Sequence, residues 1–93
     1  IGNVSTAALA YSPSINILPN PASTLVNIEL QNMPMQAIQL DLMSVDGRVI
    51  QQMELAVGTE NYSLDIQHLP AAVYFVRLST NDWTETRKLL IER

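Results

Sequence analysis

Apolar and polar side chains alternate along most of this 93-residue chain. Every second side chain is apolar between residues 26 and 30, and the same period of two recurs at 38–42, 62–66 and 74–78. This period places neighbouring side chains on opposite faces of a strand. No apolar stripe of helical period persists for three turns. The pattern predicts an all-β protein whose strands each turn one face toward a core.

Turn-forming residues separate the apolar runs at the spacing of a β-sandwich. The pair Asp46-Gly47 lies between two runs and is a strong hairpin signal. The run 48–56 has the weakest strand pattern, because its apolar residues fall on both faces. Ile50 points to one face, and the set Val49, Gln51, Met53 and Leu55 points to the other. We expect an immunoglobulin-like β-sandwich of about seven antiparallel strands. The expected strands are 15–18, 24–31, 36–44, 48–56, 61–66, 73–80 and 84–91.

Length and composition indicate one small domain with a continuous core. Residues 1–14 are small and polar, which predicts a flexible linker before a folded domain at 15–93. The chain begins at Ile1 without a signal segment, so we expect a piece of a longer protein. No apolar run approaches the length of a membrane span. A short strand at 15–18 after a linker pairs with its own sheet or forms a homodimer by strand exchange.

Charge and residue types favour no catalytic chemistry. The net charge is −4 and the five basic residues are dispersed, which argues against nucleic-acid binding. The chain has no cysteine and one histidine, His68, so a metal site or cofactor is not expected. Ser63 and Asp65 lie near His68 in sequence, but a strand followed by a turn does not bring them together. We therefore expect a domain that is recognised, not an enzyme.

Four short motifs occur in a fixed order along the chain. They are Leu18-Pro19-Asn20-Pro21-Ala22, Asp46-Gly47-Arg48, Leu69-Pro70-Ala71-Ala72-Val73-Tyr74 and Lys88-Leu89-Leu90-Ile91. Taken together, they resemble the type A C-terminal sorting domain of the type IX secretion system (the Por secretion system), over residues from about 15 to 93. One departure is Ala72, where that family usually has glycine. A positive φ at Ala72 would be strained and would alter the local turn.

Each motif also has a structural interpretation. Pro19 and Pro21 end a strand because they lack backbone donors. The stretch from Leu69 to Tyr74 is typical of a tyrosine corner. Residues 88–91 form either an ordinary edge strand or a docking strand that a receptor extends. Trp83 either contacts a partner or packs over the last hairpin.

The resemblance implies a sorting signal that takes an N-terminally attached passenger through the translocon, across the outer membrane to the cell surface of a Bacteroidota-type bacterium. There a sortase is expected to cleave the linker and join the passenger to anionic lipopolysaccharide. The residues that the resemblance assigns to recognition are Asp46, Gly47, Arg48, Leu69, Pro70, Tyr74, Lys88, Leu89, Leu90 and Ile91. Residues Pro19, Asn20, Pro21 and Ala72 belong to the turn and structural motifs.

Two other classes of function remain open from the sequence. An immunoglobulin-like or fibronectin-like adhesion or spacer module shares the fold, although such a spacer is usually internal to its parent chain. A carbohydrate-binding module needs several exposed aromatic side chains, and this chain has five aromatic residues in all. Under the sorting hypothesis, deletion of residues 88–93 stops export and leaves most of the domain folded.

Overall fold

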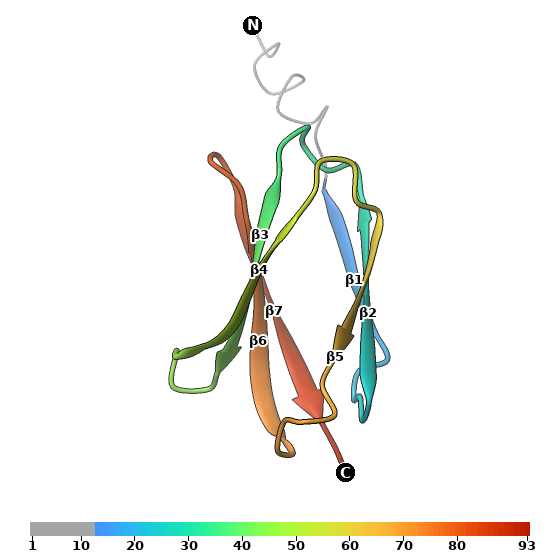
Figure 1. Ribbon diagram of the computed structural model, residues 1–93, viewed down its shortest axis with the longest axis vertical. Helices are drawn as coiled ribbons and strands as arrows, with labels where there is room; N and C mark the ends of the chain where they lie inside the picture. The colour runs from blue at the N-terminus through green and yellow to red at the C-terminus, as the bar shows by residue number, and fades with distance from the viewer. Residues whose placement is uncertain (1–12) are drawn as a thin grey trace, which may run out of the picture.

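The computed structural model describes residues 13–93, which form two antiparallel sheets packed face to face as a sandwich (Figure 1). The predicted all-β fold is confirmed, and each predicted strand lies within two residues of an observed one. The strands are β1 (Ser14–Leu18), β2 (Leu25–Gln31), β3 (Ile38–Ser44), β4 (Val49–Leu55), β5 (Asn61–Asp65), β6 (Ala72–Ser79) and β7 (Thr84–Ile91). The linker predicted at 1–14 falls mostly on residues outside the described part. Within 13–93, no helix is long and apolar enough to cross a membrane.

The strands divide into a three-stranded sheet of order β1-β2-β5 and a four-stranded sheet of order β4-β3-β6-β7. Strand β1 pairs with β2 of its own chain along its full length, from the Ser14–Gln31 pair to the Leu18–Asn27 pair. A homodimer by strand exchange therefore stays a hypothesis, which size-exclusion chromatography with light scattering would test.

The core lies between the two sheets and is filled by the inward side chains of alternating positions. Burial of an aliphatic side chain contributes about 1.5–3 kcal/mol each. Both sheets supply these side chains, so neither sheet is stable without the other. The largest fully buried side chains are Val26, Ile28, Leu30, Ile38, Leu40, Leu42, Leu64, Ile66, Val76, Leu78, Leu89 and Ile91.

A β-bulge explains why the apolar residues of β4 do not all point to the same face of the sheet. The register between β3 and β4 shifts between Leu42, which pairs with Gln51, and Met43, which pairs with Val49. Ile50 is thus the extra residue of the bulged strand. The bulge allows Val49 to lie beside the outward Met43 while the rest of β4 keeps its inward positions facing the core.

The turns use the residues that their backbone requires. Gly47 and Gly58 both have φ of +86°, a conformation that side chains with a Cβ rarely adopt. Before β6, a single turn is closed by the Leu69 N–H donating to the Ile66 carbonyl (3.1 Å). At the last hairpin the half-buried Trp83 packs against the core, as expected of a residue that covers the strand pair.

The positive φ that would strain Ala72 is absent. Among the described residues other than glycine, positive φ occurs at Asn32 (58°), just after β2, and not at Ala72. Ala72 is the first residue of β6 and pairs with Ile91. Extended backbone suits alanine as well as glycine, so the departure from the family pattern costs nothing in backbone geometry.

A buried carboxylate anchors the middle of the four-stranded sheet. Asp41 is almost fully buried and accepts hydrogen bonds from Arg77 Nη2 (2.7 Å) and Nε (3.2 Å). The side-chain amides of Gln39 and Gln52 donate to its other oxygen at 3.1 Å each. Burial raises the pKa of Asp41, but the hydrogen bonds from Gln39, Arg77 and Gln52 and the charge of Arg77 outweigh it, leaving a net lowered pKa.

The lowered pKa of Asp41 predicts an acid-sensitive fold. Its ionised form contributes stability above its ordinary value of 3.8, and this contribution is lost as the pH falls through the lower folded pKa. We expect the free energy of unfolding of the wild type to fall more between pH 5 and pH 2, roughly the window of such a carboxylate, than that of Asp41→Asn. Urea titrations of both proteins across this range measure the difference. Parallel curves would contradict the assignment.

Candidate functional site

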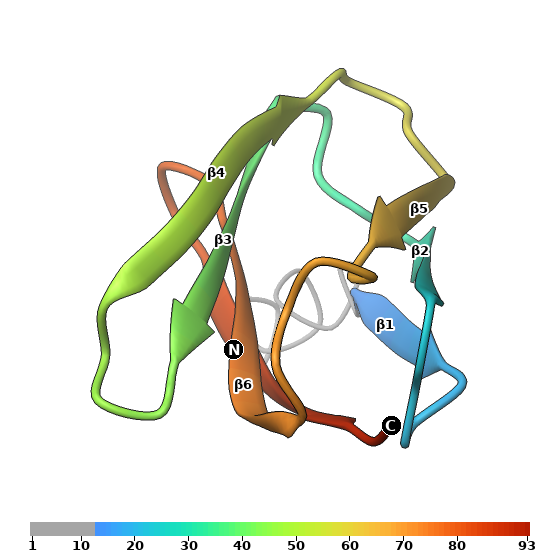
Figure 2. The ribbon, with the colours of Figure 1, turned by 60° about the horizontal axis from the view of Figure 1, so that its bottom comes forward.

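The four sequence motifs meet at one end of the sandwich. The pairs Ser44–Tyr74 and Ala72–Ile91 place the β3–β4 hairpin, the start of β6 and the end of β7 side by side. A parallel bridge between Ala22 and Ile91 brings the β1–β2 connection to the same place. Figure 2, turned so that this end comes forward, shows the β1–β2 connection and the start of β6 beside the end of β7, with the β3–β4 hairpin on the far side of β6. We call residues 19–24, 45–48, 66–71 and 88–93 the motif end.

The Asp46-Gly47-Arg48 motif is the exposed tip of the β3–β4 hairpin. The Ser44 N–H donates to the Arg48 carbonyl and the Gly47 N–H donates to the Ser44 carbonyl, both at 2.9 Å. The Ser44 hydroxyl donates to the Asp46 carboxylate, and together with backbone hydrogen bonds it lowers the pKa of that carboxyl. Asp46 and Gly47 therefore shape the turn, whereas the Arg48 side chain is exposed.

The Leu69–Tyr74 motif is a tyrosine corner. Tyr74 is buried, and its hydroxyl donates to the Pro70 carbonyl at 2.6 Å, four residues upstream. Leu69 is also buried in the core, while Pro70 is exposed. The hydrogen bond satisfies the buried phenol and fixes the path of the chain into β6.

The Lys88–Ile91 motif divides between the two faces of β7. Leu89 and Ile91 are fully buried in the core. Lys88 is exposed and Leu90 half-buried on the outer face of the four-stranded sheet. Of the four side chains in this motif, only those of Lys88 and Leu90 are accessible to a partner of the folded domain.

The outer edge of β7 is already occupied near its end. Asn20 acts as a backbone mimic, because its Nδ2 donates to the Lys88 carbonyl (3.1 Å) and its Oδ1 accepts from the Leu90 N–H (3.0 Å). The Ala22 N–H donates to the Leu90 carbonyl, and the Glu92 N–H donates to the Ala22 carbonyl, both at 2.9 Å. A receptor cannot extend this part of β7 by strand addition unless the segment 19–22 moves away, so the docking-strand interpretation does not fit the folded domain.

Arg93 joins two connections of the motif end. Its guanidinium donates to the carbonyls of Ile66 (2.6 Å) and Gln67 (3.2 Å), and also to those of Leu69 and Ser23. Hydrogen bonds from a charged donor are stronger than neutral ones. Arg93 therefore holds the β1–β2 and β5–β6 connections together beside the end of β7.

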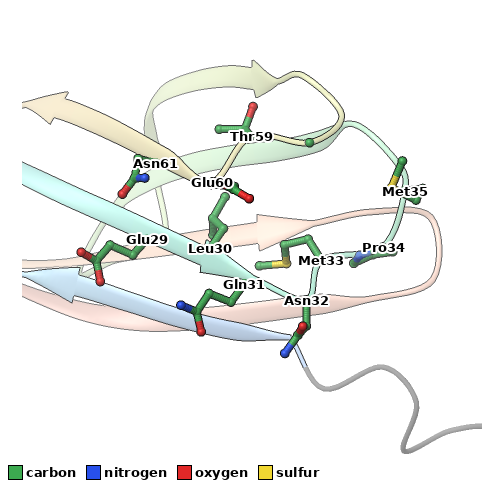
Figure 3. Close-up of a pocket in the computed structure, with 11 residues that line it drawn as sticks. Glu29, Leu30, Gln31, Asn32, Met33, Pro34, Met35, Thr59, Glu60 and Asn61 are labelled. Carbon is green, nitrogen blue, oxygen red and sulfur yellow. The ribbon is translucent and has the colours of Figure 1, made fainter.

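An open hollow of about 590 Å³ lies at the opposite end, where β2 ends and β5 begins (Figure 3). Its wall includes Glu29, Glu60, Asn32 and Thr59. The labelled polar side chains point in different directions, with Thr59 and Asn32 on opposite sides, and do not converge on one point. No motif residue lines this hollow, so it is not the site that the sequence motifs indicate.

The structure thus brings all ten predicted recognition residues to one end but leaves four of them buried. Leu69, Tyr74, Leu89 and Ile91 belong to the core, where they stabilise the fold. The sequence interpretation missed Arg93 altogether, because hydrogen bonds from a side chain to distant carbonyls leave no local pattern.

Comparison with known proteins identifies one family. The model of the family described as "Secretion system C-terminal sorting domain" matches residues 16–92, which is nearly the whole of the described structure. A search of curated proteins found no match to the chain. The matched range includes all four motifs in full and runs from within β1 to the residue after β7, so that Arg93 is the one residue of the motif end outside it.

Proposed function

Because the chain belongs to the family of secretion-system C-terminal sorting domains, we propose that it is the label by which the type IX machinery exports an attached passenger. The family indicates a type IX secretion signal and export to the outer membrane or cell surface. It also favours a non-catalytic role. In our proposal the motif end is the surface that the translocon recognises.

The arrangement of the motif end supports this proposal. Motifs spread from residue 18 to residue 91 are held at one end by Asn20, Ala22 and Arg93. The chain enters β1 at the opposite end of the sandwich (Figure 1). A passenger attached before β1 therefore joins the domain far from the motif end, and it leaves that end accessible to the translocon.

We propose further that a cell-surface sortase cleaves the chain within residues 1–14 and joins the passenger to anionic lipopolysaccharide. Strand β1 begins at Ser14, and from there on the backbone is paired. Proteases require an extended, accessible backbone, so a cut before β1 separates the passenger without opening the sandwich. Mass spectrometry of the released domain would locate the cut, and a cut inside 16–92 would contradict this step.

A fusion experiment tests the sorting role. Residues 1–93 are fused behind a neutral passenger that has its own inner-membrane signal, in one strain with the type IX machinery and one without it. We expect passenger on the cell surface in the first strain and in the periplasm in the second, measured by protease accessibility of intact cells. A passenger that stays periplasmic in both strains would favour the adhesion or spacer module instead.

A further inference from the structure

The outer face of the four-stranded sheet has a polar half and an apolar half. Pairing across β4, β3, β6 and β7 arranges its side chains in rows. The rows away from the motif end are polar: Glu54, Gln39, Ser79 and Thr84, then Gln52, Asp41, Arg77 and Thr86. The rows next to the motif end are apolar apart from one lysine: Val49, Met43, Phe75 and Lys88, then Val73 and Leu90. We call this second set, with Ile50 of the bulge, the apolar half-face.

The other sheet shows what a solvated outer face looks like in this protein. Across the middle of the three-stranded sheet Asn16 faces Glu29 and Asn27 faces Ser63, and all four side chains are polar. The two exposed apolar side chains of this face, Leu18 and Leu25, lie at the end of β1 and the start of β2. An outer face that only meets water alternates in this way with the inward apolar positions. The apolar half-face is therefore not explained by the needs of the sandwich, and clustered apolar surface marks interaction sites.

Lys88 is the charged side chain of the apolar half-face. Arg77 is engaged by Asp41, and the other ion pair among the described residues is Arg87 with Glu85. Lys88 therefore has no carboxylate within ion-pair distance in that part of the chain, although the protein carries a net charge of −4. Its cross-strand neighbour is Phe75. A complementary surface would be apolar at its centre and would place a carboxylate opposite Lys88.

We propose that the apolar half-face docks onto a protein of the export machinery whose complementary surface is apolar with an acidic border. This inference rests on the proposed sorting function and names the chemistry of the partner. Lys88 forms an ion pair with the acidic border, while Phe75 and Leu90 are buried by the apolar centre. A second copy of the domain fits poorly, because the apolar half-face contains no acidic residue to meet Lys88.

Two substitutions test this docking surface in the passenger fusion. Lys88→Glu reverses the charge, and Phe75→Gln removes the apolar centre. We expect each to lower surface-exposed passenger by about tenfold or more, as for a central contact of an interface, while Lys88→Arg retains export. Each variant is also purified and melted, because both side chains are outside the core and we expect both variants to remain folded. If Phe75→Gln does not fold, Lys88→Glu alone decides.

Matched controls lie on the same strand and on the opposite sheet. Thr86→Glu adds a negative charge to the polar half of β7, and Leu25→Gln removes an exposed apolar side chain from the other sheet. We expect both controls to be exported within about twofold of wild type, the ordinary result for residues outside an interface. Equal losses in controls and test variants would overturn the assignment to this face.

The same experiment separates the docking surface from the sorting function. If Lys88→Glu and Phe75→Gln are exported as well as the wild type, the docking surface is overturned and the sorting function stays in place. No export of the wild type would overturn the sorting function itself. A wild-type dimer in light scattering that Phe75→Gln makes monomeric would assign the surface to a second copy. Binding of wild type, but not Phe75→Gln, to vesicles of anionic lipid would assign it to a membrane.

Discussion

Deletion of Lys88–Arg93 is expected to unfold the whole sandwich. The deletion removes Leu89 and Ile91, which are fully buried between the two sheets. Loss of one such aliphatic side chain costs about 2–5 kcal/mol. The total free energy of unfolding of a small domain is only about 5–15 kcal/mol. The deletion also removes half of the pairing between β6 and β7, including the partners of Ala72 and Tyr74.

Circular dichroism of chains 1–87 and 1–93 measures this effect. We expect the full chain to melt cooperatively and the shortened chain to lack a cooperative transition at 25 °C. The control is Lys88→Ala, which removes an exposed side chain of the same segment and should leave the melting temperature nearly unchanged. A cooperative melt of chain 1–87 close to that of the full chain would show that the segment is a dispensable tail.

This expectation changes how a truncation is interpreted. From the sequence, residues 88–93 resembled a terminal signal that is separable from the folded body. In the structure they supply core side chains, edge pairing and the Arg93 contacts. Failed export of the truncated protein would therefore not distinguish loss of recognition from loss of folding. Substitutions of exposed side chains such as Lys88 and Arg48 avoid this problem.

The strands and turns of this domain could be predicted from the sequence because their causes are local. A period of two specifies a strand, and Asp46-Gly47 specifies a tight hairpin, since glycine adopts the required positive φ. The tyrosine corner spans only the four residues from Pro70 to Tyr74. The sequence left the backbone at Ala72 open, because the glycine of the family pattern indicates a positive φ only by resemblance; the structure shows no positive φ there.

The features that build the candidate site could not be predicted, because they depend on contacts between distant segments. Asn20 meets Lys88 and Leu90 only after both sheets have formed. The apolar half-face also depends on distant segments. The period of two puts Phe75 on the face opposite Tyr74, but it does not show that Met43 of β3 and Lys88 of β7 lie beside Phe75.

Substitution of Asn20 is expected to loosen the end of β7 and to destabilise the whole domain. Asn20→Ala removes the partners of the Lys88 carbonyl and the Leu90 N–H. Each lost hydrogen bond of this kind costs about 1 kcal/mol, and more where the group stays unsatisfied. We expect a loss of about 1–3 kcal/mol. In a domain of this size each kcal/mol lowers the melting temperature by roughly 4–8 °C.

Asn20→Asp gives a sharper version of the same test. Its carboxylate can still accept from the Leu90 N–H, but at neutral pH it has no proton to donate and repels the Lys88 carbonyl. We expect it to be at least as unstable as Asn20→Ala at pH 7, and to recover partly in acid, where a protonated carboxyl donates again.

Thermal melts and amide hydrogen exchange measure both substitutions. The Leu90 amide should exchange faster in Asn20→Ala than in wild type, because its acceptor is gone. Asn16→Ala is the matched control, since Asn16 is an exposed asparagine of β1 that faces water. Its melting temperature and its Leu90 exchange should stay close to those of wild type. If Asn20→Ala behaved like this control, the edge of β7 would be held by the backbone of Ala22 alone, and the Pro19-Asn20-Pro21 segment would serve only to turn the chain.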